Sequence, residues 1–513
     1  MKTIKTIKAQ ISALIILGFI AQPGFATLVE MAEYQDWSAV ESSISREDIN
    51  EVQPDGMTAL FWAVYYDQTD IVRLLINAGA NPNAETRYGL TPLIQAAMNG
   101  NSDMISMLLD AGADANAMTP AGDNAILNAS KTGAAEGVLA LIEAGANVNS
   151  RDSYLFQTPL MWAAASNQAD VAQILIDNGA DINAISAALD LRGVLQSRVQ
   201  GDFPDGGLTA LHHAARENAI ETARVLIDNG ADLDTLDPQD ISALRFAIIN
   251  ANLDLAKMLV EGGANINDGA LVDLLDVETN TLTFIRAEKN YVNETTPVEL
   301  MGIMFDMGVD VDAYPHKAYP FPATGFRAGD GTAGQTALYN AAARDKQELM
   351  ALFLEHGADP NSLNKDEKYF PLSAAFVVVP GIYRPGTMDD EEYIPTIEEL
   401  SPGVELLIEH GANINATSKD GTTVLHHAAA MGREAVVQYL IDNGADLSIR
   451  DHSNRTALDI AQGVPEFSEE DEEPAEEPVY DEIVTLLTEA MNAQGIAIEE
   501  YVPPASSEES AEA

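Results

Sequence analysis

Residues 209–232 read TALHHAARENAIETARVLIDNGAD, and residues 423–446 read TVLHHAAAMGREAVVQYLIDNGAD. The opening threonine of each stretch can cap a helix, because its hydroxyl accepts a hydrogen bond from an amide of the first turn. Paired alanines follow, and their small side chains allow a neighbouring helix to approach closely. A second apolar stretch ends at a glycine, which adopts the left-handed conformation of a helix C-cap at little cost. Each stretch therefore predicts two short helices followed by a turn.

The glycine that closes this pattern recurs along the chain. It stands at Gly79, Gly112, Gly145, Gly179, Gly230, Gly263, Gly308, Gly357, Gly411 and Gly444. Of the nine successive spacings, five are 33 or 34 residues, and the others are 45, 49, 51 and 54 residues. A fixed period of this kind indicates a repeat protein, and the longer spacings indicate units that carry insertions.

These residues resemble the ankyrin repeat, whose hallmark is T-P-L-H-x-A-A followed by L-L-x-x-G-A-D-x-N. The resemblance covers residues 56–462. It implies an all-α ankyrin-repeat solenoid, in which helix–turn–helix units with β-hairpin fingers stack in series. Each unit of such an array buries its apolar face only against its neighbours.

The repeat pattern divides the chain into segments with different expected structures. We expect a signal peptide at 1–26 and N-terminal capping helices at 27–53. Repeats 1–6 are expected at 54–268 with a finger insertion at 185–205, a degenerate repeat 7 at 269–332 with an insertion at 313–332, and repeats 8–10 with the start of repeat 11 at 333–462 with an insertion at 380–400. The rest is expected to be an acidic disordered insertion at 463–480, a C-terminal capping helix at 481–491 and an acidic tail at 492–513. The first helix of repeat 7 is expected at 270–275. The aromatic, proline-containing run at 314–327 fits a contact loop, and equally a segment that folds back over repeat 7.

The N-terminal segment predicts export from the cytoplasm. Lys2, Lys5 and Lys8 precede an apolar run at 11–21, and Gly24-Phe25-Ala26 has the small-x-small pattern of a cleavage site. This order is typical of a secretory signal peptide cleaved near Ala26, with an uncleaved anchor as the alternative. The protein is then periplasmic or secreted. No other stretch is long and apolar enough to span a membrane, so no span is expected after cleavage.

The charge restricts the partners. The chain has 27 Lys and Arg residues against 80 Asp and Glu residues, a formal net charge of −53. A field of this sign repels phosphate backbones, so nucleic-acid binding is excluded, and it favours a protein partner with a basic surface. The chain has no cysteine, which excludes disulfides and thiolate ligands.

The sequence predicts no catalytic residue, no cofactor and no metal. His212 and His426 fill the histidine position of the motif, where the family hydrogen-bonds the ring to backbone between units. The Asp or Asn after each Gly-Ala pair, such as Asp114 and Asn147, is interpreted as a turn residue rather than a calcium ligand. An enzyme with its catalytic groups on the insertions at 185–205 or 313–332 is a competing hypothesis, and an exported effector or toxin-neutralising protein is another.

The resemblance also implies where a partner binds. In ankyrin domains the recognition surface is usually concave and consists of the fingers and the exposed end of each first helix. Carrying these positions over gives Tyr65, Tyr66, Arg87, Tyr88, Leu90, Met98, Asn99, Tyr154, Leu155 and Phe156. Tyrosine and arginine are favoured at binding hot spots. Trp62, Trp162 and Phe246 are instead expected in the core between units. The predicted function is a monomeric, non-catalytic protein-binding scaffold whose partner can be a periplasmic enzyme that it protects or helps to assemble.

Overall fold

The computed structural model describes residues 27–190, 204–279, 292–315, 334–365, 370–376, 402–465 and 478–502. The expected signal peptide at 1–26 and the insertion at 380–400 lie outside these residues. So do most of the insertions at 185–205, 313–332 and 463–480 and the last part of the tail. The chain forms two compact units, residues 1–184 and residues 185–513.

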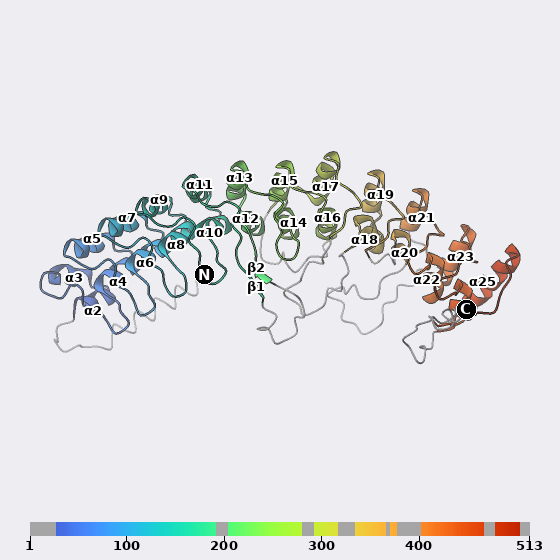
Figure 1. Ribbon diagram of the computed structural model, residues 1–513, viewed down its shortest axis with the longest axis horizontal. Coiled ribbons are helices and arrows are strands. Elements are labelled where there is room, and N and C mark those ends of the chain that lie inside the picture. Colours follow the sequence, from blue (N-terminus) through green and yellow to red (C-terminus); the bar gives the residue numbers. More distant parts are fainter. Residues whose placement is uncertain are drawn as a thin grey trace, which may run out of the picture. The chain divides into compact units, whose positions relative to one another are not determined.

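Unit 1 consists of paired antiparallel helices in two rows (Figure 1). The pairs are α2 (Leu28–Glu33) with α3 (Trp37–Ser43), α4 (Ala59–Tyr65) with α5 (Thr69–Asn77), α6 (Pro92–Asn99) with α7 (Ser102–Asp110), α8 (Ala125–Thr132) with α9 (Ala135–Glu143), and α10 (Pro159–Ala165) with α11 (Ala169–Asp177). The pair α2–α3 precedes repeat 1, and the other four pairs are repeats 1–4. First helices pack against first helices and second helices against second helices, so each repeat stacks on the next.

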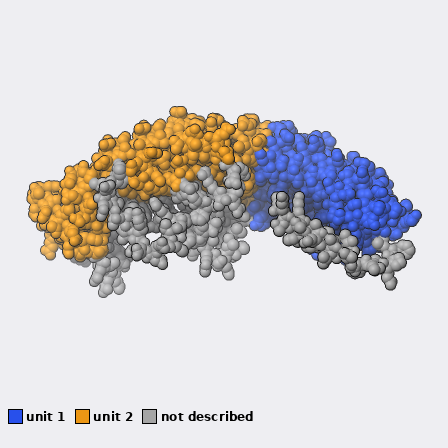
Figure 2. Space-filling view, turned by 180° about the vertical axis from the view of Figure 1, so that it is seen from behind, with its two compact units in different colours: residues 1–184 blue, residues 185–513 orange. Residues whose placement is uncertain are grey.

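Unit 2, drawn in orange in Figure 2, also consists of helix pairs. Repeats 5–11 are α12 (Ala210–Glu217) with α13 (Ile220–Asp228), α14 (Ala243–Ile249) with α15 (Leu253–Glu261), α16 (Ala270–Glu278) with α17 (Pro297–Asp306), α18 (Ala337–Ala343) with α19 (Gln347–Glu355), α20 (Pro371–Phe376) with α21 (Pro402–Glu409), α22 (Val424–Ala430) with α23 (Glu434–Asp442), and α24 (Ala457–Ala461) with α25 (Asp481–Gln494). One finger carries a short antiparallel ladder of β1 (Ala188–Asp190) and β2 (Pro204–Gly206), with Ala188 opposite Gly206. The predicted all-α ankyrin solenoid is confirmed.

The helix ends follow from the residues that the pattern placed there. The hydroxyl of Thr91 accepts a hydrogen bond from the amide of Ile94 at 3.3 Å, and Pro92 occupies the first helical position, where no amide is needed. The ten recurring glycines all have φ between +80° and +94°. An added Cβ would meet no atom within 4 Å at any of them, so these positions require glycine for backbone conformation and not for space.

An asparagine in the turn after several of these glycines ties one repeat to the next. The amide nitrogen of Asn83 donates to the carbonyl of Gly112 at 2.9 Å, and its oxygen accepts from the amide of Asp114 at 2.8 Å. Asn116 makes the same two bonds to Gly145 and Asn147. Asp114 meanwhile accepts from the amide of Asn116 within its own turn. These side chains are therefore committed to backbone groups, as expected for turn residues.

The motif histidines connect repeats as expected. His212 Nε2 donates to the carbonyl of Ile241 in the next repeat at 3.2 Å, and its Nδ1 accepts from the hydroxyl of Thr209 at 2.8 Å. His426 bonds Arg455 and Thr423 in the same way, at 3.2 and 2.8 Å. Since a carbonyl can only accept, the ring is the neutral tautomer with its proton on Nε2.

A buried ion pair replaces this arrangement between repeats 6 and 7. Arg245 occupies the histidine position of repeat 6, and only 2% of its surface is exposed. Its Nε and Nη2 donate to the two carboxylate oxygens of Asp273 at 2.6 and 3.2 Å. Burial opposes the charge on Arg245, but the carboxylate of Asp273 outweighs it and raises the pKa of the guanidinium. Asp276, one turn further along α16, pairs with Arg344 of repeat 8 at 2.5 Å.

Several elements differ from the sequence-based expectation. The first helix of repeat 7 runs from Ala270 to Glu278, beyond the expected 270–275, and α25 continues to Gln494 rather than 491. The extra residues of the 45-residue spacing lie between α16 and α17, where we expected no insertion. Phe246 is buried, but Trp62 and Trp162 are only half-buried, so their assignment to the core was wrong. Each indole donates a hydrogen bond, Trp62 Nε1 to Gln53 at 3.0 Å and Trp162 Nε1 to Asp152 at 3.3 Å.

We predict that Asp273→Ala lowers the free energy of unfolding by about 3–5 kcal/mol, because it leaves a buried guanidinium without its carboxylate. Urea denaturation followed by circular dichroism measures this loss. The double variant Arg245→Met with Asp273→Leu removes both charges at similar volume and is expected to recover most of the stability. A loss of less than about 1 kcal/mol in the single variant would contradict the burial of this pair.

Buried histidines are expected to make the fold sensitive to acid. Burial lowers the pKa of His212 to about 4, of His213 to about 3 and of His427 to about 4. Because these values lie below the ordinary value of about 6.5, the unfolded chain takes up protons first as the pH falls. The stability that each neutral ring contributes is complete above about pH 6.5 and is lost progressively as the pH falls toward 4.

His213→Leu isolates this effect, because other repeats carry an apolar residue at that position. As the pH falls from 6 to 4, the free energy of unfolding of this variant, relative to that of the natural chain, should rise by about 1.4 kcal/mol for each pH unit. Burial raises the pKa of Asp268, which acts in the opposite direction but equally in both proteins. Urea midpoints of the two proteins, measured at each pH, test this expectation. A difference that does not change with pH would show that His213 is not buried as a neutral ring.

Candidate functional site

Four aromatic rings pack together at the exposed end of the first helix of repeat 1. Tyr65 and Tyr66 meet edge to face at 5.0 Å between ring centres, and Trp62 lies 5.7 Å from each of them. Trp37 of α3 meets Tyr66 at 6.0 Å. Tyr65 still exposes 49% of its surface, whereas Tyr66 is half-buried. The sequence placed Tyr65 and Tyr66 correctly at the end of α4, but Tyr66 serves mainly to hold the other rings.

The finger of repeat 2 presents Arg87 and Tyr88. Backbone bonds fix its turn, since Thr86 donates to the carbonyl of Leu90 at 2.9 Å and Arg87 donates to the carbonyl of Asp55 in the preceding finger at 2.7 Å. The guanidinium of Arg87 lies 4.6 Å from the centre of the Tyr88 ring, and its Nη2 also donates to the Tyr88 hydroxyl. Tyr88 is 61% exposed, and Leu90 is half-buried at the base of the finger. Arg87 and Tyr88 thus form a preorganised cation–π pair on the surface.

Met98 and Asn99 end the first helix of repeat 2 and differ in role. Met98 is exposed and is free to contact a partner. The side-chain nitrogen of Asn99 donates to the carbonyl of Val64 in repeat 1 at 2.7 Å, and its oxygen accepts from Gln95 at 2.9 Å. Asn99 therefore connects repeats 1 and 2.

The finger of repeat 4 exposes the side chains of Tyr154 and Phe156. Asp152 accepts from the amides of Tyr154 and Leu155 at 3.1 and 2.9 Å, and Arg151 donates to the carbonyl of Phe156 at 3.2 Å. Phe156 has a φ of +55°, which is unusual for a bulky residue. Tyr154 is 62% exposed, Phe156 is also exposed and Leu155 is half-buried. A hydrophobic ring held outward by a strained turn is a feature found at contact sites.

Sequence reasoning missed two residues of the same surface. Lys131 ends the first helix of repeat 3 in the register of Tyr65 and Met98, and its ammonium lies 4.6 Å from the centre of the Trp162 ring. Met118 lies in the finger of repeat 3 and is exposed. Applying the rule for repeats 1, 2 and 4 to repeat 3 would have found both of them.

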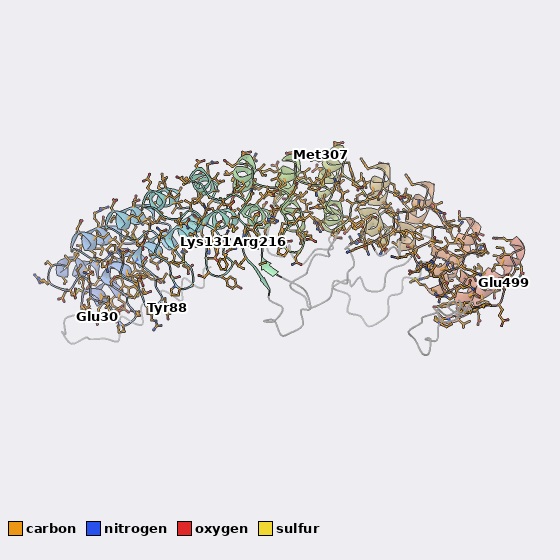
Figure 3. All side chains as sticks on the ribbon, viewed as in Figure 1. Glu30, Tyr88, Lys131, Arg216, Met307 and Glu499 are labelled. Carbon is orange, nitrogen blue, oxygen red and sulfur yellow. The ribbon has the colours of Figure 1, made fainter. Side chains whose placement is uncertain are left out.

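The contacts join the predicted residues into three groups, in repeat 1, in the repeat 2 finger and in the repeat 4 finger. Eight exposed apolar side chains come from fingers or first-helix ends of unit 1: Tyr34, Val52, Tyr65, Tyr88, Met98, Met118, Tyr154 and Phe156. We call the last six the aromatic face. Figure 3 shows Tyr88 on the finger side of unit 1, away from the second helices. On the second helices, Leu74 and Leu139 are exposed by 43% and 41%. Isolated residues of that kind are ordinary, whereas a gathered set marks a contact surface.

Among the residues that the structure describes, no group of three or more His, Asp or Glu side chains is arranged to hold a metal ion. None of the described helices has the length and apolar character that a membrane crossing requires.

The chain belongs to the ankyrin-repeat family. The profile for "Ankyrin repeats (3 copies)" matches residues 28–119, 112–186, 191–270 and 398–466, which is more than half of the chain, and the single "Ankyrin repeat" profile matches residues 333–365. The ankyrin fold is a protein–protein interaction scaffold, so this general function follows from the family.

Similar proteins share only part of their length with this chain. The mouse B-cell lymphoma 3 protein homolog is 32% identical over 25% of this chain and 24% of its own length. Palmitoyltransferase AKR1 of Lachancea kluyveri is 33% identical over 51% of this chain and 30% of its own length. The chain therefore spans less than a third of these relatives. The crystal structure of the human ASB11 ankyrin repeat domain is 25% identical, with a TM-score of 0.39, over 48% of this chain and 99% of that domain.

We predict that Tyr65→Ala lowers the free energy of unfolding by about 1–3 kcal/mol, because it removes two edge-to-face ring contacts. Tyr154→Ala is the matched control, since its ring is exposed and has no such pair among the described rings; it should change stability by less than about 0.5 kcal/mol. Urea midpoints compare the two variants. Equal midpoints would mean that the rings of repeat 1 do not support one another.

Proposed function

We propose that this chain is a non-catalytic protein-binding scaffold, active in the periplasm or outside the cell, which holds its partner on the aromatic face of unit 1. The observation that carries the proposal is the gathering of exposed tyrosine, phenylalanine and methionine side chains on fingers and first-helix ends. Aromatic side chains give a large contact area with few rotatable bonds, which is why they dominate binding energy at interfaces.

The rigidity of this face supports a binding role. The fingers are joined by backbone bonds, as between Arg87 and Asp55, and Arg87 already lies over the Tyr88 ring. A surface ordered before binding loses less side-chain and loop entropy when a partner arrives. The aromatic face is therefore suited to bind a folded protein without rearrangement.

The charge supports a cationic partner and a monomeric scaffold. A net charge of −53 attracts basic proteins over a distance and repels other copies of the chain. Arg87 and Lys131 lie against aromatic rings, so contact on this face depends on the rings more than on ion pairs. The association rate should accordingly fall as salt is added.

The location is proposed from the N-terminal sequence. Lys2, Lys5 and Lys8, the apolar run at 11–21 and the small-x-small site ending at Ala26 match the parts of a secretory signal. The partner is then to be sought among envelope or secreted proteins, which include periplasmic enzymes that a scaffold can protect or help to assemble.

The test is capture of the partner from an envelope fraction by crosslinking with the tagged chain. Tyr88→Ala with Tyr154→Ala should reduce recovery of the captured protein at least tenfold, because two hot-spot rings are lost. The matched control is Leu74→Ala with Leu139→Ala, which removes two exposed apolar side chains from the second helices of the same unit. Both variants should keep the melting temperature of the natural chain. Recovery that is equal in the two variants would refute the aromatic face as the binding surface.

A further inference from the structure

The C-terminal segment of the chain returns to a finger of its own unit. After α25 the chain turns at Gly495, whose φ is +72°, and residues 495–502, here called the strap, reach the finger of repeat 11 at residues 447–456. Helix α25 is about 21 Å long, and eight extended residues span up to about 27 Å, so the strap can run back along the full length of the helix.

Three contacts seat the strap on the finger. The hydroxyl of Tyr501 donates to the carbonyl of Ser453 at 3.0 Å. The side-chain nitrogen of Asn454 donates to the carbonyl of Val502 at 2.7 Å, and Arg450 Nη2 pairs with Glu499 at 3.4 Å. Glu499 and Tyr501 are two residues apart and therefore lie on the same side of an extended chain, whereas Glu500 points to the other side.

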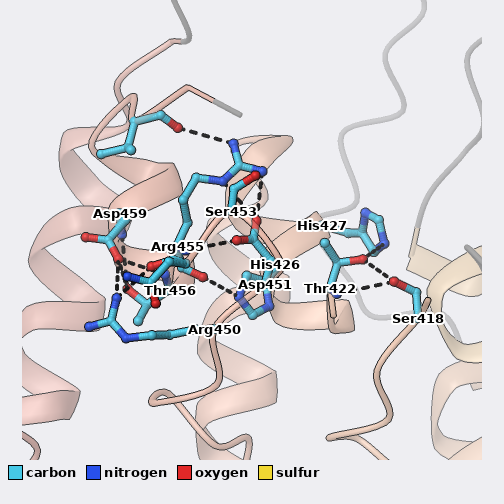
Figure 4. Close-up of polar contacts among 12 residues, drawn as sticks. Ser418, Thr422, His426, His427, Arg450, Asp451, Ser453, Arg455, Thr456 and Asp459 are labelled. Atoms are coloured by element: carbon cyan, nitrogen blue, oxygen red, sulfur yellow. Dashed lines mark hydrogen bonds and ion pairs between the residues drawn. The ribbon is translucent and has the colours of Figure 1, made fainter. Parts of the chain in front are cut away.

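The finger that receives the strap is held rigid by its own polar groups (Figure 4). Arg455 pairs with the buried carboxylate of Asp451 at 2.8 Å and also donates to the carbonyl of Val464 at 3.3 Å. Arg450 Nη1 donates to the carbonyl of Asn454 at 2.7 Å, which leaves Nη2 to meet Glu499. Asn454 has a φ of +63°, and its side-chain nitrogen is the donor to the strap. The finger is thus preorganised to bind an extended segment.

The strap is not needed to close the end of the stack. Helix α25 does that, since Ile483, Leu487 and Met491 are buried where it packs against α23 and α24. In the strap, Ile498, Glu499 and Val502 remain exposed, and only Tyr501 and Ile496 are half-buried. Its attachment therefore rests on two hydrogen bonds and one exposed ion pair, interactions that are individually weak. A segment held in this way can exchange with another of the same chemistry.

We propose that the finger of repeat 11 is a binding site for an extended peptide segment with a carboxylate two residues before a tyrosine, and that the strap is its resident occupant. Arg450 binds the carboxylate, the Ser453 carbonyl accepts from the tyrosine hydroxyl, and Asn454 binds the next carbonyl. A partner protein that carries such a segment displaces the strap. The site lies in unit 2 and does not depend on the aromatic face of unit 1.

The probe is the peptide of residues 495–502, GIAIEEYV, acetylated and amidated so that the Val502 carbonyl remains an amide carbonyl. Saturation-transfer NMR on the tyrosine ring protons reports binding to the chain. A chain truncated after Gln494 should give a signal at least fivefold stronger than the full chain, in which the strap occupies the finger. Full-length Tyr501→Phe, which keeps every helix, should also admit the peptide. Equal signals from these chains and the natural one, or no signal from either variant, would overturn the proposal.

Matched variants test which residues of the peptide meet which residues of the finger. Asn454→Gly removes the side-chain donor but keeps the left-handed turn, and it should abolish the signal in the truncated chain. Asn218→Gly is its control, because Asn218 also has a positive φ, +58°, far from this finger in sequence. In the peptide, Glu499→Gln should weaken binding two- to fivefold and Glu500→Gln should not, although both remove one charge. A signal that survives Asn454→Gly, or equal effects of the two glutamine peptides, would refute this mode of binding.

Discussion

The structure depends on contacts between successive repeats, because no helix pair buries its apolar face alone. First helices pack on first helices, and small alanine side chains at their contacts keep the neighbours close. Polar bonds then fix the register of the stack. Asn83 joins the turns that follow repeats 1 and 2, His212 joins repeats 5 and 6, and Arg245 with Asp273 joins repeats 6 and 7. Each of these residues stabilises only a nearest-neighbour contact, so stability along each unit is a sum of local terms.

This mode of stacking determines which surface is available for binding. Neighbouring repeats cover the buried sides of the helices, and the described second helices expose isolated apolar side chains such as Leu74, Leu139 and Val298. The exposed finger rings, such as those of Tyr88 and Tyr154, contribute little to the contacts between repeats, so these positions can vary without loss of the fold. In unit 1 the fingers carry Tyr88, Tyr154 and Phe156, and in unit 2 the finger of repeat 11 holds the strap through Arg450 and Asn454. Fingers of both units are thus open to binding for the same physical reason.

Sequence alone predicted the repeat fold, because the glycine positions and threonine caps act within one helix pair. It also placed His212 and His426, whose bonds follow from the motif. It failed where the outcome depends on neighbours, as with Trp62 and Trp162, whose half-burial reflects the side chains of adjacent repeats. The ion pair of Arg245 with Asp273 and the contacts of the strap with its finger were not predicted, because they join residues that no local sequence pattern connects. For the aromatic face, sequence reasoning located five of the six residues, but it missed Met118, the separate role of Asn99 and the contact of Lys131 with Trp162.

The central claim is that stacking leaves the fingers and first-helix ends of unit 1 to bind a protein. Hydrogen exchange followed by mass spectrometry, with and without the captured partner, tests it most directly. The account predicts slower exchange on binding in the fingers at 86–90 and 151–157, and unchanged exchange in the second helices at 69–77 and 135–143. Protection confined to the second helices, or found only in unit 2, would contradict it.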